Sequence, residues 1–198
     1  MNLNIVPAKQ GLTWVKQGIR TFWRQPLAFT GLFFLFMAWV SLLSMLPVIG
    51  AVLALLVLPA ATLGLMVATE QATSGKFPMP TVLMVAFRAG QQRLKAMLVL
   101  GGMYAVSFLA VMALSALIDG GDFAKVYLAN APITPEVVND PDFQIAMWFA
   151  TILYIPLSML FWHAPALVHW HGVPPLKSMF FSAVACWRNL GAFAVYLL

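Results

Sequence analysis

The sequence predicts an all-α fold, a polytopic transmembrane helical bundle with amphipathic interfacial helices on its cytoplasmic face. Of the 198 residues, 62% are hydrophobic and only 9% are charged, whereas an ordinary soluble domain is about 45–50% apolar and about 25% charged. Several stretches contain no charged residue, and they are at least as long as the roughly 20 residues that are needed to cross a bilayer. This composition excludes a soluble enzyme and a disordered chain. The single cysteine, Cys186, excludes a framework of intrachain disulfides.

The chain begins with a basic amphipathic segment, residues 7–25. Its apolar residues share one arc of a helical wheel: Leu12, Val15, Ile19, Phe22 and Trp23. Lysine and arginine side chains flank this arc, a pattern typical of a helix that lies in the plane of the lipid headgroups. We therefore expect an interfacial helix here. Shorter stretches that end in arginine or lysine just before residues 95 and 189 predict further helices of this kind.

Residues 27–69 contain no charged side chain, and 43 residues are about twice the length of one span. Pro47 and Gly50 lie near the middle of this run and favour a tight turn. The run therefore predicts a helical hairpin, with spans at about 27–46 and 49–69.

Three further apolar segments complete the predicted single membrane domain, 1–198. The third and fourth spans are expected at about 95–118 and 143–166, joined by an external loop at 119–142 that carries three prolines and five acidic residues. A fifth apolar segment, 189–198, is only 10 residues long, and a helix of that length reaches only about 15 Å. We expect it to be the truncated start of a fifth span.

The charges predict an orientation. With this topology, ten of the eleven lysine and arginine residues lie on one side of the membrane and five of the six acidic residues on the other. Basic residues mark the cytoplasmic side, so the N-terminus is predicted to be cytoplasmic. The net charge of +5 then indicates contact with anionic phospholipids, not with nucleic acid. The residues expected to hold lipid headgroups are Lys16, Arg20, Arg24, Arg93, Lys95 and Arg188.

All three histidines of the chain, His163, His169 and His171, lie within nine residues at the end of the fourth span. Clustered imidazoles can bind zinc, copper or haem, so these residues are candidate metal ligands. Their spacing does not match the i, i+3 or i, i+4 spacing of helical ligands. Aromatic neighbours also favour a simpler interpretation, in which they are polar tips at the membrane interface.

Four segments resemble one family of proteins, residues 23–28, 31–36, 161–172 and 177–182. That family consists of uncharacterised polytopic inner-membrane proteins of Gram-negative, mainly beta-proteobacterial, species. The arrangement of interfacial helix and hairpin more distantly resembles the membrane domain attached to some glycerophosphodiester phosphodiesterases. The resemblance implies a multi-pass protein of the bacterial inner membrane, and it implies no activity and no catalytic residue.

The sequence contains no H-E-x-x-H, G-x-S-x-G, P-loop or G-x-G-x-x-G motif. We therefore expect a non-enzymatic protein without a cofactor, which acts structurally or interacts with lipid or with a partner protein. A membrane-protein partner and self-association both stay open. One alternative is a transporter of small solutes or lipids, with a path lined by hydroxyl groups near Pro59 and Pro156. A second alternative is a metal- or haem-binding membrane protein built on His163, His169 and His171.

Overall fold

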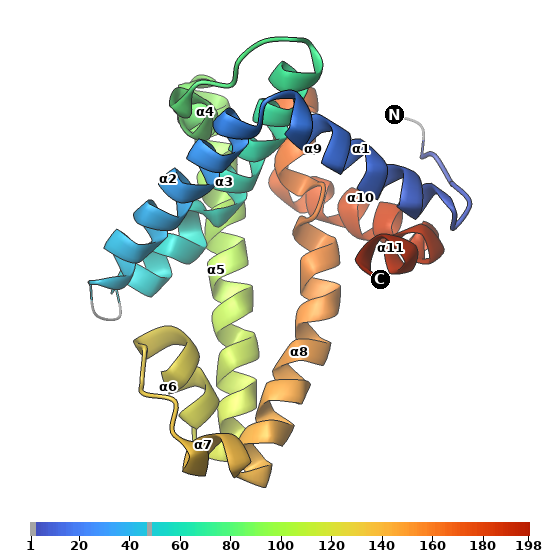
Figure 1. Cartoon of the computed structure of the whole chain (residues 1–198). Helices are drawn as coiled ribbons and strands as arrows, with labels where there is room; N and C mark the ends of the chain where they lie inside the picture. The colour runs from blue at the N-terminus through green and yellow to red at the C-terminus, as the bar shows by residue number, and fades with distance from the viewer. Residues whose placement is uncertain (1–2, 47–48) are drawn as a thin grey trace.

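The computed structural model describes residues 3–46 and 49–198, and every regular element in these ranges is a helix (Figure 1). The α-helices are α1 (Gln10–Arg24), α2 (Pro26–Ser44), α3 (Ile49–Thr73), α4 (Val85–Arg88), α5 (Gln91–Asp119), α6 (Asp122–Ala129), α7 (Pro135–Asn139), α8 (Pro141–Phe161), α9 (Ala164–His171), α10 (Pro175–Arg188) and α11 (Leu190–Leu197). A 3-10 helix, η1 (Pro80–Met84), precedes α4. The predicted all-α fold is confirmed.

Four segments are long and apolar enough to cross a membrane: Pro26–Leu43, Ile49–Thr73, Gln91–Asp119 and Pro141–His171. Local sequence explains where they begin and end. Pro26 and Pro141 occupy first helical positions, where the missing N–H of proline costs nothing. The Asp140 side chain caps α8 by accepting the N–H of Asp142 at 2.8 Å. The predicted turn residue Pro47 lies outside the described residues.

The central helix is α5, which packs between α3 and α8. Its 29 residues make it about 44 Å long. Leu63 of α3 and Leu100 of α5 are fully buried at this contact layer. A Cβ atom at Gly101 would collide with the backbone carbonyl oxygen of Leu56, so glycine allows α5 to approach α3 closely.

The segment predicted as one continuous fourth span, 143–166, is interrupted after Phe161. Pro165 has no N–H to donate to the carbonyl of Phe161, so the helix cannot continue regularly. Ser182 of α10 bonds to the backbone on both sides of the break. Its Oγ accepts the N–H of His163 at 2.9 Å and donates to the carbonyl of Met159 at 2.7 Å. The helix then resumes as α9.

The last predicted segment, 189–198, forms the short helix α11. The helix α11 bends by 78° from α10 and packs along α1. Asn189 lies at this bend: its Nδ2 donates to the carbonyls of Ala185 and Asn4, and its Oδ1 accepts the N–H of Val6 at 2.8 Å. The predicted external loop 119–142 contains two short helices, α6 and α7.

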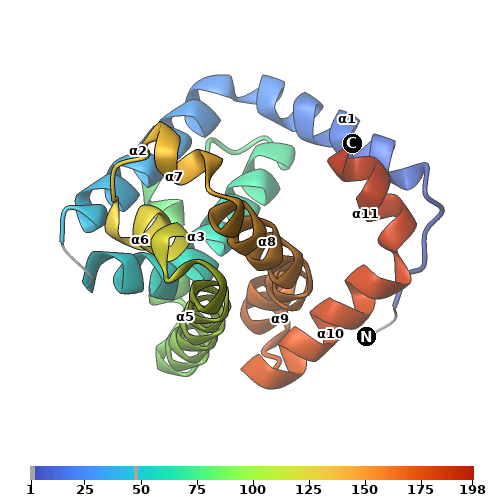
Figure 2. The same cartoon turned by 90° about the horizontal axis from the view of Figure 1, so that it is seen from below.

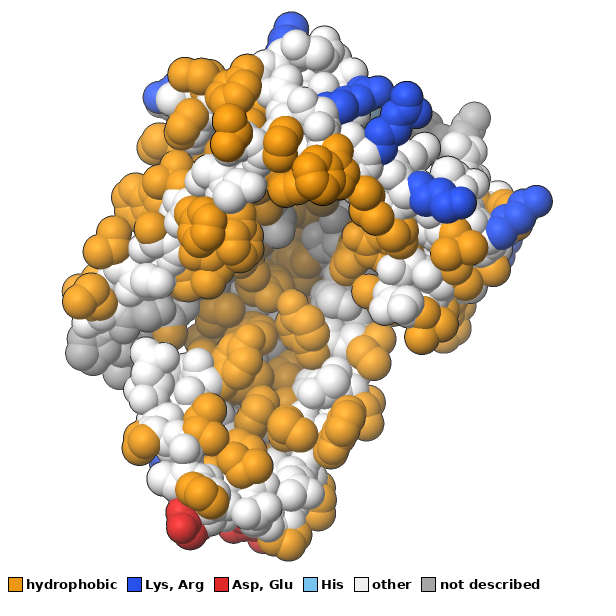
Figure 3. Space-filling model, in the orientation of Figure 1, with side chains coloured by type: hydrophobic (Ala, Val, Ile, Leu, Met, Phe, Trp, Pro, Cys, Tyr) orange, Lys and Arg blue, Asp and Glu red, His pale blue; other side chains and the backbone are white. Residues whose placement is uncertain are grey.

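The helices surround a hollow. The α2–α3 hairpin lies on one side of α5, α8 lies on the other, and α6 and α7 lie at one end (Figure 1). At the opposite end, α1 runs along the edge of the molecule from α2 to α11 (Figure 2). Figure 3 shows the hollow below α1, with visible walls that are mostly hydrophobic.

Candidate functional site

A groove of about 760 Å³ separates α1 from the rest of the bundle. Its walls come from α1, the last turns of α3, the break between α8 and α9, and α11. We call it the α1 groove, and its polar and aromatic lining consists of Trp14, Gln17, Arg20, Thr21, Arg24, Thr69, Thr73, Trp162, His163, Phe193 and Tyr196. On the face shown in Figure 3, Lys and Arg side chains gather at this end, and Asp and Glu side chains lie at the opposite end.

The amphipathic pattern of α1 explains which residues enter the groove. Gln17, Arg20 and Arg24 lie on the polar face of the helix, and this face lines the groove. Leu12 and Ile19 lie on the apolar arc and are 55% and 56% exposed. Such exposed apolar side chains suit a helix that rests in a membrane interface. The predicted helix forms, and its polar face lines an open groove in which Gln17, Arg20 and Arg24 stay exposed.

The two arginines carry the positive charge of the groove. They are four residues apart on α1, so their side chains share one face. Arg24 Nη1 donates to the carbonyl of Thr73 at 3.1 Å, which holds one guanidinium at the end of α3. Within residues 3–46 and 49–198, the ion pair found is Lys125 with Asp122, so neither groove arginine has a carboxylate partner. A guanidinium with free N–H donors matches a phosphate or carboxylate ligand.

Aromatic rings form the wall of the groove nearest α11. Phe193 contacts Trp14 and Trp162, with ring centroids 5.4 and 5.5 Å apart. Tyr196 contacts the same two tryptophans at 6.2 and 6.3 Å. These contacts attach α1 to α11. Tryptophan and tyrosine are enriched where an apolar region meets a polar one, as at the headgroup level of a bilayer.

The structure brings together two of the six residues predicted to hold headgroups. Arg20 and Arg24 line the α1 groove, but the other four do not line it. Lys16 is exposed on α1, Arg93 and Lys95 lie in the first turns of α5, and Arg188 is the last residue of α10. These four keep their predicted role as surface contacts, which nothing in the structure tests.

The three histidines are not brought together. His169 and His171 are two residues apart on α9, and such residues do not share a helical face. His163 lies in the break before α9 and contacts Phe193. The described part of the chain contains no group of three His, Cys, Asp or Glu side chains placed to hold a metal. The metal hypothesis thus gains no geometric support, and elemental analysis of the purified protein would test it.

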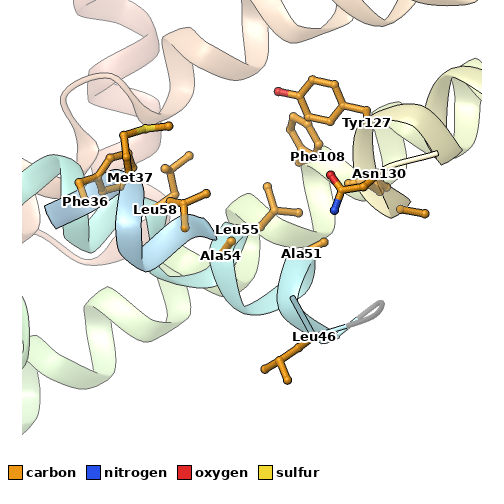
Figure 4. A pocket seen from close by; sticks show the side chains of 13 residues that line it. Phe36, Met37, Leu46, Ala51, Ala54, Leu55, Leu58, Phe108, Tyr127 and Asn130 are labelled. Atoms are coloured by element: carbon orange, nitrogen blue, oxygen red, sulfur yellow. The ribbon is translucent and has the colours of Figure 1, made fainter. Parts of the chain in front are cut away.

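A second cavity of about 430 Å³ lies between α2, α3, α5 and α6 (Figure 4). We call it the α6 cavity. Its walls include Leu55 and Leu58 of α3 and Phe108 of α5, and its polar groups come from Tyr127 and Asn130. The α2–α3 hairpin and α5 border both this cavity and the hydrophobic hollow.

The serine and threonine hydroxyls expected along a transport path bond to their own helices instead, and the Tyr154 hydroxyl shares a hydrogen bond of 3.3 Å with that of Tyr104. Thr62 donates to the carbonyl of Pro59 at 2.9 Å, and Ser158 donates to the carbonyl of Ile155 at 2.7 Å. Neither Pro59 nor Pro156 lines the α1 groove or the α6 cavity. These bonds are the usual role of hydroxyls in membrane helices, and they do not favour the transport hypothesis.

Sequence reasoning missed two groups of residues that shape the groove. The aromatic face of α11, Phe193 and Tyr196, was read only as part of an apolar span. The break beside His163 is itself indicated by Pro165, because a proline in the middle of an apolar run signals a kink or a broken helix. Ser182, which bonds to the backbone at this break, carries no such signal in the sequence, because its hydrogen bond with His163 joins residues 19 positions apart.

Comparison with known proteins identifies a protein with a similar sequence. It is 47% identical over 199 residues to a Burkholderia thailandensis protein described as a probable inner membrane protein, and the match covers 99% of this chain and 74% of that protein. No family model and no solved structure matches the sequence. None of the comparisons supports the more distant resemblance to the membrane domain of glycerophosphodiester phosphodiesterases. Together with the four span-length apolar helices, the match shows an integral membrane protein. The chain belongs to the family of this probable inner membrane protein.

Proposed function

We propose that the protein is a non-enzymatic, lipid-interacting protein of the inner membrane, with a cytoplasmic N-terminus and a basic end that holds anionic phospholipid headgroups. One observation carries the proposal. Arg20 and Arg24 line a groove of the α1 end without a carboxylate partner among the described residues. Unpaired guanidinium groups at the level of the interface attract the phosphates of anionic lipids, by about 1 kcal/mol for each basic residue.

Lipid selectivity tests this function directly. The protein is reconstituted into mixed bilayers of phosphatidylcholine and phosphatidylglycerol, and one of the two lipids carries bromine on its chains to quench tryptophan fluorescence. We expect brominated phosphatidylglycerol to quench more strongly than its mole fraction predicts, and the excess to fall at high salt. Equal quenching by the two lipids would remove the basis of the proposal.

The orientation needs a separate experiment. Cys186 is replaced by serine, and single cysteines are introduced as Thr13→Cys on α1 and Val138→Cys on α7, both at exposed positions. A thiol reagent that cannot cross membranes is then applied to spheroplasts. We expect label on the Val138→Cys protein in intact spheroplasts, and on the Thr13→Cys protein only after permeabilisation. The reverse pattern would place the basic end outside.

A further inference from the structure

We infer that the α1 groove and the hydrophobic hollow below it form a binding site for one anionic glycerophospholipid molecule. Its phosphate lies at Arg20 and Arg24, and an acyl chain follows the hollow into the α6 cavity. This inference rests on the proposed function and narrows it. A general attraction between a basic surface and anionic lipids needs no specific site, whereas here the lipid is held by named residues in a fixed place.

The hydrogen-bond donors of the groove indicate where the lipid headgroup binds. A guanidinium has five N–H donors, and the hydrogen bond to Thr73 uses one from Arg24. The carbonyl of Thr73 thus orients Arg24 and leaves donors for a ligand. Arg20, one turn earlier, approaches the same volume. Since no carboxylate lines the groove, the ligand that complements it carries the negative charge itself.

The aromatic residues of the groove indicate where the headgroup of the lipid meets its acyl chains. Trp14, Trp162 and Tyr196 line the groove on its side toward α11. Each of these rings has an apolar body and one polar atom, so they suit the region where a phospholipid changes from polar to apolar. The groove therefore combines cationic donors with amphipathic rings.

The shape of the helical bundle indicates where the acyl chain of the lipid lies. The helix α8 packs on α5 and α10, whereas α2 packs on α3. The space between the hairpin and α8 is a hydrophobic concavity in Figure 3. Figure 4 shows Leu55, Leu58 and Phe108 around the α6 cavity, which the same hairpin and α5 border. A concave apolar surface in a membrane protein is filled by lipid chains, because neither water nor a void is favourable there.

The test measures lipid retained by the purified protein with native mass spectrometry. Three ligands are offered: dioleoyl phosphatidylglycerol, dioleoylglycerol with the same chains but no phosphate, and glycerol 3-phosphate with phosphate but no chains. We expect one retained molecule of phosphatidylglycerol and none of the other two. If dioleoylglycerol is retained to the same extent, the phosphate is not needed and the proposed headgroup contacts are wrong. If glycerol 3-phosphate is retained, the acyl chains are not needed and the proposed chain contacts are wrong.

Variants locate the headgroup. We expect the double variant Arg20→Gln/Arg24→Gln to bind phosphatidylglycerol at least about tenfold more weakly, since charge-assisted hydrogen bonds are lost. The matched control is Arg88→Gln/Lys177→Gln, which removes the same charge at exposed positions outside the groove and should bind within about twofold of the unchanged protein. The single variant Arg20→Gln has no bond to Thr73 to lose, so it tests the site if the double variant unfolds.

A second pair of variants locates the chain. Ala54 lines the α6 cavity, and Ala54→Trp fills it. Val52 lies on the same helix outside the cavity, so Val52→Trp is its control. We expect Ala54→Trp to weaken binding of the dioleoyl lipid but not of a dihexanoyl phosphatidylglycerol with short chains. Equal effects of the two tryptophans would overturn the placement of the chain.

The outcomes separate this inference from the proposed function. If both double variants lose phosphatidylglycerol equally, the lipid follows net charge, and the specific site is wrong while the proposed function stands. If no variant changes retention, the site is wrong as well. If the quenching experiment shows no preference for the anionic lipid, the proposed function itself is wrong.

Discussion

Replacing Ser182 with alanine tests how the broken fourth span is stabilised. Ser182 is fully buried, and its hydroxyl joins the end of α8 to the start of α9 through Met159 and His163. The substitution removes one oxygen atom, leaves the N–H of His163 without this acceptor, and leaves the carbonyl of Met159 with only the weak bond from Cys186 Sγ at 3.8 Å. Ser182 is fully buried, so water does not easily replace the lost hydroxyl.

The expected destabilisation is about 1–3 kcal/mol. Each buried polar group left unsatisfied costs about 1–3 kcal/mol, but hydrogen bonds between membrane helices average only about 0.6 kcal/mol, because the unfolded state in the membrane also finds partners. Ser178 provides a matched control on the same helix. It is equally buried, yet its hydroxyl donates to the carbonyl of Pro175, one turn earlier on α10. We expect Ser178→Ala to change stability by about 0.5 kcal/mol or less.

The measurement is equilibrium unfolding in mixed micelles of a mild detergent with increasing sodium dodecyl sulfate, followed by tryptophan fluorescence. The free energies of unfolding of the two alanine variants are compared with that of the unchanged protein. If Ser178→Ala costs as much as Ser182→Ala, then burial of a small residue matters, and the hydrogen bonds across the break do not.

Three further predictions concern single contacts. Gly101→Ala forces a methyl group against the backbone of α3 and should cost about 1–3 kcal/mol, whereas Gly102→Ala, whose nearest atom outside its own helix backbone is 4.0 Å away, should be neutral or slightly stabilising in the same unfolding experiment. Asn189→Ala removes the bond to the N–H of Val6, so hydrogen exchange of that amide should become faster while the amides of α5 stay protected. Asp140→Ala removes the cap of α8 and should lower the free energy of unfolding by about 1 kcal/mol; an unchanged value would mean that water caps this helix equally well.

The sequence predicts the four long apolar helices well, because their signal is local. Residues 27–69 contain no charge at all, and a bilayer leaves such a run few structures other than helices. The start of α2 at Pro26 and the start of α8 at Pro141 follow in the same way from proline and its neighbours. None of these features depends on a residue far away in the sequence.

The candidate site was predictable only in part, because its geometry depends on contacts between distant segments. A helical wheel places Arg20 and Arg24 on the polar face of α1, but it does not indicate what that face packs against. The groove exists because Phe193 and Tyr196, far along the chain, contact Trp14. The histidines illustrate the opposite case. Their proximity in sequence suggested a cluster, but the helical geometry of α9 places His169 and His171 on different faces.

The helical state of α1 has a mechanical consequence. The helix has 15 residues and is about 22 Å long. It runs from α2 at one end to its contacts with α11 at the other. A flexible linker in this place would allow a range of separations between the hairpin and the C-terminal helices, but a helix allows only one. Adding or deleting one helical turn in α1 would change that separation by about 5.4 Å. The separation between α2 and α11 therefore depends on the number of residues in α1.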